Sequence, residues 1–214
     1  MSAAQLITFD LFGTLVDWRA GLARDCATAG EPLGPEDFDD IVDRQGKLEQ
    51  GPHAPYAEIV RRSLVDVLGL DDVAAARIGA NVGRWPLYPD ASDALRLLML
   101  DAPCAALTNS DCAHGEQVQE QLGFRLSDWL CAEECGHYKP DPAVWEAMAR
   151  RRGIAFGPEW WHVSAYADYD LAVANHLGLT TVFVARPHAR PGPATYAVKD
   201  LAELVTMWAT ARDG

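Results

Sequence analysis

The sequence predicts an α/β fold, with a Rossmann-like core of parallel strands and a small helical cap inserted after the first strand. Short apolar runs at residues 6–9, 103–107, 161–164 and 181–184 have the length and composition of buried parallel strands. Residues 170–177 lie between the last two runs and have helical spacing that ends at Gly178. Strand, helix and strand in this order predict βαβ units and therefore a parallel sheet.

The segment that follows the first strand has a different pattern. From Trp18 to Tyr88, apolar residues recur at helical spacing, as at Val60 and Leu64, and no strand pattern is present. A proline-containing stretch at residues 85–90 then interrupts the chain. We therefore expect a helical cap domain at residues 17–88 and a core domain formed by residues 1–16 and 89–214.

The composition restricts the class of protein. The chain has 214 residues, of which 49% are hydrophobic and 23% are charged, as in ordinary globular proteins. Its formal net charge of -13 repels nucleic acid and anionic membranes, and its apolar runs are too short to cross a bilayer. The five cysteines include no CxxC pair, and no signal peptide is visible. We expect a cytoplasmic protein with reduced thiols, no bound metal, and no nucleic-acid or membrane partner.

The first strand ends at an acidic residue that is followed by a glycine turn. Asp10 comes directly after the apolar run and precedes Gly13 and Thr14. A carboxylate at a strand end, next to the N–H groups of a turn and kept ionised by a cation, can act as a nucleophile. An aspartate that only caps the turn would give the same pattern.

Polar residues also follow two of the other expected strands. Thr108 and Asn109 end the second run, and Ser164 ends the third. Ligands of open α/β sheets bind beyond the carboxyl ends of the strands. We therefore expect these side chains and Asp10 to converge on one crevice.

Four segments, taken in order, resemble the motifs of the haloacid dehalogenase superfamily. They are D-L-F-G-T-L at residues 10–15, L-T-N at 107–109, Y-K-P-D-P at 138–142, and the stretch from Ser164 to Asp170. The resemblance covers nearly the whole chain and implies the superfamily's fold, with the helical segment as its cap. It also implies that Asp10 is a covalent nucleophile, that Lys139 holds its carboxylate, and that Asp170 is the acid of the fourth motif. Asp168 is the alternative for that acid.

The residue two positions after the nucleophile separates two activities within the superfamily. Phosphatases have a second aspartate there, which protonates the leaving alkoxide, whereas this chain has Phe12. General acid catalysis typically contributes about 10²–10⁴-fold, but a halide leaves as a stable anion and needs no proton. Phe12 therefore favours carbon–halogen cleavage. The run from Phe9 to Trp18 also resembles the type II (L-2-)haloacid dehalogenases.

The resemblance implies substrate contacts from both the cap and the core. In similar dehalogenases an arginine of the first cap helices binds the leaving halide, and Arg44 is the residue that we expect in this role. A guanidinium suits it because it is always charged and weakly hydrated. Other cap arginines are alternatives: Arg19, Arg24, Arg61, Arg62 and Arg84. We expect the remaining substrate-binding residues to be Phe12, Thr14, Thr108, Asn109 and Ser164.

Two residues depart from the pattern of the superfamily. Tyr166 stands where many relatives have Asn or His, and Trp145 stands where they usually have Tyr or Phe. We expect Trp145 to lie in a helix core, because Trp is usually well buried. Tyr166 puts the positioning of the hydrolytic water in question, so a non-catalytic member of the superfamily stays an alternative.

The function that we expect is the hydrolytic dehalogenation of short 2-haloalkanoic acids through an ester on Asp10. It would need no cofactor and no metal, because Lys139 and Arg44 supply the positive charge. A phosphatase of the same superfamily is a second alternative, and it would need Mg²⁺. The expected partner is a small anionic substrate, and a homodimer is compatible with these observations.

Overall fold

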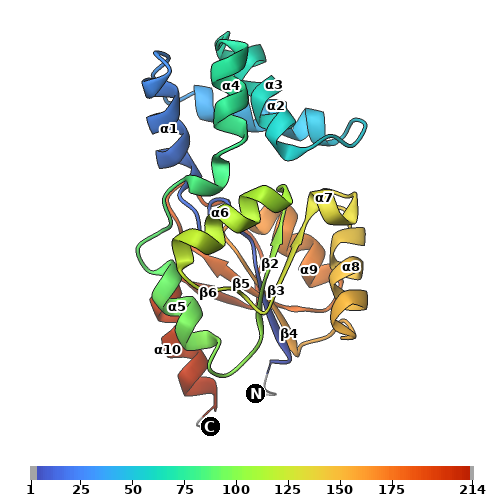
Figure 1. The fold of residues 1–214 in the computed structure, drawn as a ribbon. Coiled ribbons are helices and arrows are strands. Elements are labelled where there is room, and N and C mark those ends of the chain that lie inside the picture. Colours follow the sequence, from blue (N-terminus) through green and yellow to red (C-terminus); the bar gives the residue numbers. More distant parts are fainter. Residues whose placement is uncertain (1–3, 213–214) are drawn as a thin grey trace.

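The computed structural model describes residues 4–212 and contains a parallel sheet flanked by helices (Figure 1). The strands are β1 (Leu6–Phe9), β2 (Cys104–Thr108), β3 (Asp128–Cys131), β4 (Trp160–Ser164), β5 (Thr180–Val184) and β6 (Tyr196–Val198). Their order in the sheet is β3-β2-β1-β4-β5-β6, and every neighbouring pair is parallel. The predicted α/β class is confirmed, although the sequence patterns did not reveal the edge strands β3 and β6.

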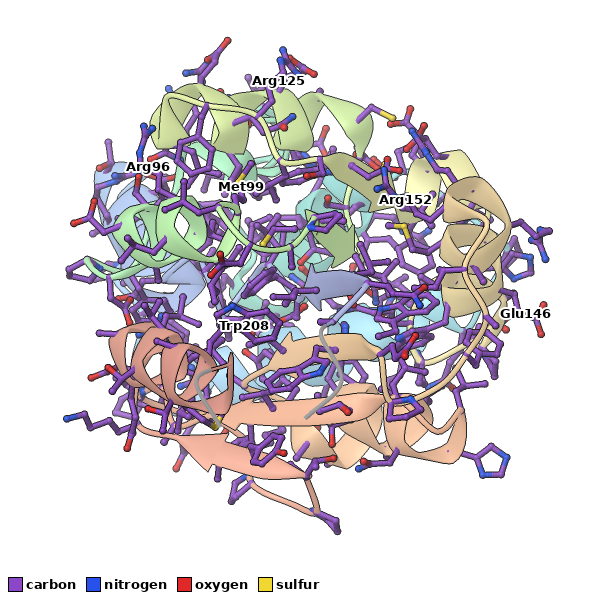
Figure 2. The ribbon with its side chains drawn as sticks, turned by 90° about the horizontal axis from the view of Figure 1, so that it is seen from below. Arg96, Met99, Arg125, Glu146, Arg152 and Trp208 are labelled. Atoms are coloured by element: carbon purple, nitrogen blue, oxygen red, sulfur yellow. The ribbon has the colours of Figure 1, made fainter. Side chains whose placement is uncertain are left out.

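Helices cover both faces of the sheet. The helices α5 (Ala91–Leu98), α6 (Cys112–Leu122) and α10 (Leu201–Arg212) share one apolar cluster with Ile7 and Phe9, whereas α8 (Ala143–Arg152) and α9 (Ala172–His176) share the other with Leu6. This division follows from the alternation of side chains along a strand. Seen from below, Trp208 lies between α10 and the sheet, and Glu146 points outward from α8 (Figure 2).

The helices between β1 and α5 lie beyond the carboxyl ends of the strands (Figure 1). They are α1 (Trp18–Thr28), α2 (Asp37–Glu49), α3 (Tyr56–Leu68), α4 (Asp72–Gly79) and the short 3₁₀ helix η1 (Val82–Arg84). Helix α3 packs against α2 and α4, and Ile41, Ile59 and Leu64 are buried among them. We call these helices the cap. Its predicted limits, residues 17 and 88, stay a prediction.

A turn of π-helix connects β4 to α9. It spans Ala167–Leu171, and the backbone N–H of Leu171 donates to the carbonyl of Tyr166, five residues earlier (3.2 Å). Such single π turns occur frequently at functional sites. This one buries Asp170 completely, whereas Asp168 remains exposed. Another short helix, α7 (Ala132–Cys135), follows β3. Within residues 4–212, no helix combines the length and the apolar character needed to cross a bilayer.

Candidate active site

Asp10 lies at the carboxyl end of β1, in the middle of the sheet, and two side chains hold its carboxylate. The Lys139 ammonium donates to Oδ1 (2.8 Å), and the Thr14 hydroxyl donates to Oδ2 (2.7 Å). The Thr14 oxygen in turn accepts from the backbone N–H of Ala165 (2.9 Å), next to the end of β4. Both carboxylate oxygens therefore have a fixed direction, which is what a nucleophile requires.

Lys139 also connects the nucleophile to a second buried acid. Its ammonium donates to Asp170 Oδ2 (2.9 Å), while Asp170 Oδ1 pairs with His162 Nε2 (3.1 Å). The other ring nitrogen of His162 contacts the Thr8 hydroxyl (2.8 Å). Lys139 is 1% exposed, and Asp170 and His162 are 0% exposed, so water does not screen these charges. The sequence did not identify His162 as part of the site.

Burial and the neighbouring charges shift the pKa values of this cluster in different directions. Burial raises the pKa of Asp10 above its usual value, and the Asp170 carboxylate adds to the increase, although Lys139 and Thr14 oppose it. Burial alone would lower the pKa of Lys139, but Asp10 and Asp170 together raise it. For Asp170, burial is outweighed by Lys139 and His162, which lower its pKa. Lys139 therefore stays charged, and Asp170 is a poor base.

A cavity of about 940 Å³ opens above Asp10, between the cap and the carboxyl ends of the strands. Thr108, Asn109 and Lys139 line its floor together with Asp10. Asn109 is fixed there by two hydrogen bonds to the backbone of Lys139, in which its Nδ2 donates (3.0 Å) and its Oδ1 accepts (2.6 Å). The loops after β1, β2 and β3 thus meet on one floor.

Aromatic side chains form much of the cavity wall beside the nucleophile. Phe12 lies between Tyr56 and Trp85, with both ring centroids 5.9 Å from its own. Tyr166 crosses the turn after Asp10, and its hydroxyl accepts a hydrogen bond from Trp18 Nε1 (2.9 Å). A Cβ at Gly13, which has a φ of +92°, would lie 2.2 Å from that hydroxyl oxygen. Only glycine fits there, because it tolerates both this φ and the approach of Tyr166.

The structure does not bring Arg44 to the cavity, which corrects the prediction for that residue. Arg44 lies on α2, and its guanidinium pairs with Asp66 of α3 (2.6 Å), on the outside of the cap. Arg19 of α1 lines the cavity instead. Its guanidinium carbon lies 5.2 Å from the Trp18 ring centroid and 4.9 Å from that of Phe38.

Arg19 also has capacity to bind an anion. One terminal nitrogen pairs with Asp39 (3.1 Å), but its buried Nε has no hydrogen-bond partner among the described residues. A guanidinium with a donor to spare, held between two aromatic rings, is suited to a weakly hydrated anion. Which of the two arginines lines the cavity depends on the rotation of α2 about its axis and on the pairing of Arg44 with Asp66. Neither can be inferred from the sequence.

Comparisons with known proteins support a single family. The family model of the haloacid dehalogenase-like hydrolases matches residues 4–163. The chain belongs to this family. It is 26% identical to (S)-2-haloacid dehalogenase 4A of Burkholderia cepacia, over 92% of this chain and 91% of that protein. The chain is therefore a hydrolase, as predicted.

Solved structures agree with this family assignment. The structure of the L-2-haloacid dehalogenase PA0810 is 29% identical, covers 96% of this chain and 99% of its own, and superposes with a TM-score of 0.82. An L-2-haloacid dehalogenase from Xanthobacter autotrophicus, 19% identical, covers 95% and 98% with a TM-score of 0.81 and shares the fold. The fold of this hydrolase thus matches that of these proteins over nearly the whole chain.

Apart from Arg44, the predicted site residues of this haloacid dehalogenase-like hydrolase fall into two groups around the cavity. Those that line it are Asp10, Phe12, Thr108, Asn109 and Lys139. The others, Thr14, Ser164 and Asp170, are fully buried behind it. Thr14 and Asp170 hold Asp10 and Lys139, and the Ser164 hydroxyl accepts from the backbone N–H of Tyr166 (3.1 Å). These three therefore position groups of the site from behind its surface.

The two candidates for the acid of the fourth motif, Asp170 and Asp168, lie in different environments in this hydrolase. Asp170 is 0% exposed and bonded to Lys139, whereas Asp168 lies at the rim of the cavity and faces Arg190 (3.5 Å). The structure thus favours Asp170. Trp145 is 0% exposed in the cluster beneath α8, in agreement with the predicted helix core.

Glu49, an acidic residue of the cap, also lines the cavity, although the sequence motifs did not point to it. It is the last residue of α2 and lines the same cavity as Asn109. Burial raises the pKa of Glu49 to about 8, although Lys139 and Asn109 oppose the shift. One signal was available, because an acidic residue is unfavourable at the negative end of a helix dipole.

Magnesium, which the phosphatase alternative would need, does not fit these residues. The ion would need oxygens from Asp10 and Asp170. In each carboxylate both oxygens already have partners, and Lys139 lies between them as the shared cation. A divalent ion would therefore have to displace a buried ammonium from both acids.

Among the described residues, one other group has possible metal ligands. The ligand atoms of Cys112, Cys131 and Glu133 all lie within 4.8 Å of one another, and the two sulfurs are 3.5 Å apart. Burial raises the pKa of both thiols, and Glu133 already accepts a hydrogen bond from the backbone N–H of Cys112 (2.7 Å). These three residues would leave a tetrahedral site one ligand short.

Proposed function

We propose that this hydrolase removes halide from short 2-haloalkanoic acids through an ester on Asp10. The observation that carries the proposal is the pairing of a fixed nucleophile with an aromatic neighbour: Lys139 and Thr14 orient Asp10, and Phe12 lines the cavity beside it. This arrangement provides a nucleophile at Asp10 but no proton donor two residues later, where the chain has Phe12. The names of the 26% and 29% identical relatives, both 2-haloacid dehalogenases, support the same reaction.

In the first step, a carboxylate oxygen of Asp10 attacks the carbon that bears the halogen, and the carbon–halogen bond breaks. The halide departs on the side opposite the attack, toward the cap, where the Arg19 guanidinium lines the cavity. Asn109, beside the nucleophile, donates to the carboxylate of the substrate. The cluster of Asp10, Lys139 and Asp170 changes from a net charge of minus one to zero as the ester forms.

In the second step, water attacks the carboxyl carbon of Asp10, and the ester bond to the product breaks. One proton of the water goes to the departing alkoxide oxygen, and the other is released to solvent as Asp10 returns to the carboxylate. The Lys139 ammonium already donates to Asp10 Oδ1, so it stabilises the oxyanion that forms there. Asp170 acts through Lys139, because it is fully buried behind the cavity and its lowered pKa makes it a weak base. The 2-hydroxy acid then leaves with one oxygen taken from Asp10.

Two measurements test the proposal. Chloride release from chloroacetate and 2-chloropropionate, followed beside phosphate release from an aryl and an alkyl phosphate with Mg²⁺, separates the dehalogenase from the phosphatase. We expect chloride and no phosphate. A single turnover in ¹⁸O-labelled water should then give an unlabelled 2-hydroxy acid and place the label on Asp10. Label in the first product would contradict the ester, and phosphate release alone would replace the proposed activity.

A further inference from the structure

Glu49 is the acidic side chain that the cap places opposite the core residues of the cavity. It ends α2 and lines the cavity together with Asp10 and Lys139. It lines the same cavity as Asn109, whose side chain opposes the rise in the pKa of Glu49, so Glu49 lies beside the position where the proposed function puts the carboxylate of the substrate. An acid and an anionic substrate would thus meet at Asn109.

The groups around Glu49 are largely committed to other partners. The Lys139 ammonium donates to Asp10 and Asp170, and the hydroxyls of Tyr56 and Tyr138 donate to Gln45 Oε1 and to the carbonyl of Ala54. Asn109 already uses one of its two amide hydrogens on the carbonyl of Lys139. The C-terminal end of α2 adds the negative end of a helix dipole. This environment favours the neutral carboxylic acid over the carboxylate.

We propose that Glu49 recognises the carboxylate of the substrate as a neutral acid, donating its proton in a hydrogen bond to the bound carboxylate. The site would therefore select short monocarboxylates, and only while Glu49 is protonated. An ionised Glu49 would place a second negative charge against the substrate in a partly buried cavity, where repulsion is weakly screened. This inference rests on the proposed function, because it takes the substrate to be a carboxylate at Asn109.

Other titratable groups also line the cavity, and burial raises the pKa of one of them, Asp10, in the same direction as that of Glu49. The others include Arg19, Asp43, Lys47 and His53 of the cap segment, Tyr56 of α3, and Tyr138, Lys139 and Tyr169 of the core. Burial raises the pKa of each of the three tyrosines. Burial would lower the pKa of Lys139, but its two acids raise it, so it remains charged.

The sign of the pH dependence follows from the pKa of Glu49, which burial raises to about 8. Below that pH the acid is neutral and carboxylates bind. Above it, the protonated fraction falls tenfold for each pH unit, so the dissociation constant should rise by about tenfold for each unit. The kcat of bound substrate should change little, because Glu49 acts in binding.

The test measures binding of racemic lactate, an unreactive short carboxylate, by calorimetry between pH 6.5 and 9.5. For the wild type we expect a constant dissociation constant at low pH and an increase above pH 8. Glu49→Gln keeps a hydrogen-bond donor of the same shape but cannot ionise, so its dissociation constant should stay flat. Asp40→Asn, which removes an exposed charge from the same helix, should keep the wild-type profile and so controls for net charge.

Proton uptake provides a readout that needs no variant. Calorimetry in two buffers of different ionisation enthalpy should show close to one proton taken up per lactate bound at pH 9.5, and close to none at pH 6.5. A flat wild-type profile, the same profile in Glu49→Gln, or no lactate binding at any pH would overturn the inference. If the enzyme releases chloride but lactate binding does not depend on pH, the Glu49 inference is wrong and the proposed dehalogenase activity still holds. If lactate binding depends on pH through Glu49 but no chloride is released, only the proposed dehalogenase activity is contradicted.

Discussion

The cavity has a floor, formed by the core residues around Asp10, and a roof, formed by the cap. The two differ in how their polar groups are bonded. On the floor, Asp10, Lys139 and Asp170 are almost completely buried, and hydrogen bonds use both oxygens of each carboxylate. On the roof, the cap contributes the Arg19 guanidinium and Glu49, an acid whose pKa burial raises to about 8. The floor is therefore rigid and fully satisfied, whereas the roof retains hydrogen-bonding capacity.

This difference separates two tasks. A nucleophile and its cation must be held in one geometry, and packing within a parallel sheet provides that. Recognition of substrate and leaving group needs polar groups that reach the cavity, and the cap supplies Arg19 and Glu49 there. We therefore expect substitutions in the floor to affect chemistry and stability, and substitutions in the roof to affect mainly affinity.

The largest effect should come from Asp10→Asn. An amide cannot attack carbon, while it keeps the shape of the carboxylate and can still accept from Thr14, so turnover should fall by at least about a thousandfold. Chloride release measures the loss of turnover, and thermal melting of the same preparation shows whether the fold is kept. The exposed variant Asp40→Asn should keep wild-type turnover. Halide release by Asp10→Asn at a tenth of the wild-type rate or more would remove Asp10 from the mechanism.

The floor was largely predictable from the sequence, whereas the roof was not. Asp10, Thr108 and Asn109 end apolar strands, so the parallel sheet brings them to one edge. The position of Lys139 came from the resemblance to the superfamily. Edge strand β3 begins with the charged Asp128, and β6 has only three residues, so neither shows a clear apolar run.

The roof depends on tertiary contacts that leave little trace in the sequence. Arg44 and Arg19 have the same chemistry, and what separates them is that Asp66 of α3 pairs with Arg44 outside the cavity. The participation of His162 likewise depends on a π turn that points Asp170 toward it. One-residue shifts of this kind change which side chain faces a cavity, and periodicity does not resolve them.

Removal of the shared cation should give the next largest effect. Lys139→Met leaves two buried carboxylates without their counter-ion, and breaking a buried pair in this way typically costs about 3–5 kcal/mol. For a chain of this size we expect the melting temperature to fall by about 10 °C, together with loss of chloride release. Lys199→Met, at an exposed lysine, should melt within about 2 °C of the wild type. Equal melting temperatures for the two variants would contradict the buried network.

The two cap arginines give a matched pair with a smaller effect. Arg19→Ala removes the donor that we assign to the departing halide, and loss of a charged hydrogen bond should lower kcat/KM by about 10–100-fold. Arg44→Ala breaks an exposed pair with Asp66, which is typically worth less than about 1 kcal/mol, so kcat/KM should stay within about twofold. Steady-state kinetics on 2-chloropropionate measures both. A larger loss of kcat/KM in Arg44→Ala than in Arg19→Ala would assign halide binding to Arg44 and show that the cap rearranges when substrate binds.

The smallest effect should come from metal removal, which tests whether the floor is already complete. A divalent ion would have to compete with Lys139 for Asp10 and Asp170, and His162 already occupies the remaining oxygen of Asp170. Lys139 supplies a positive charge at that position without a metal. Chloride release after EDTA treatment should therefore stay within about twofold of the untreated rate, and added Mg²⁺ should not increase it. Loss of activity with EDTA and its recovery with Mg²⁺ alone would mean that Lys139 moves away from one of its acids during turnover. The floor would then be as adaptable as the roof.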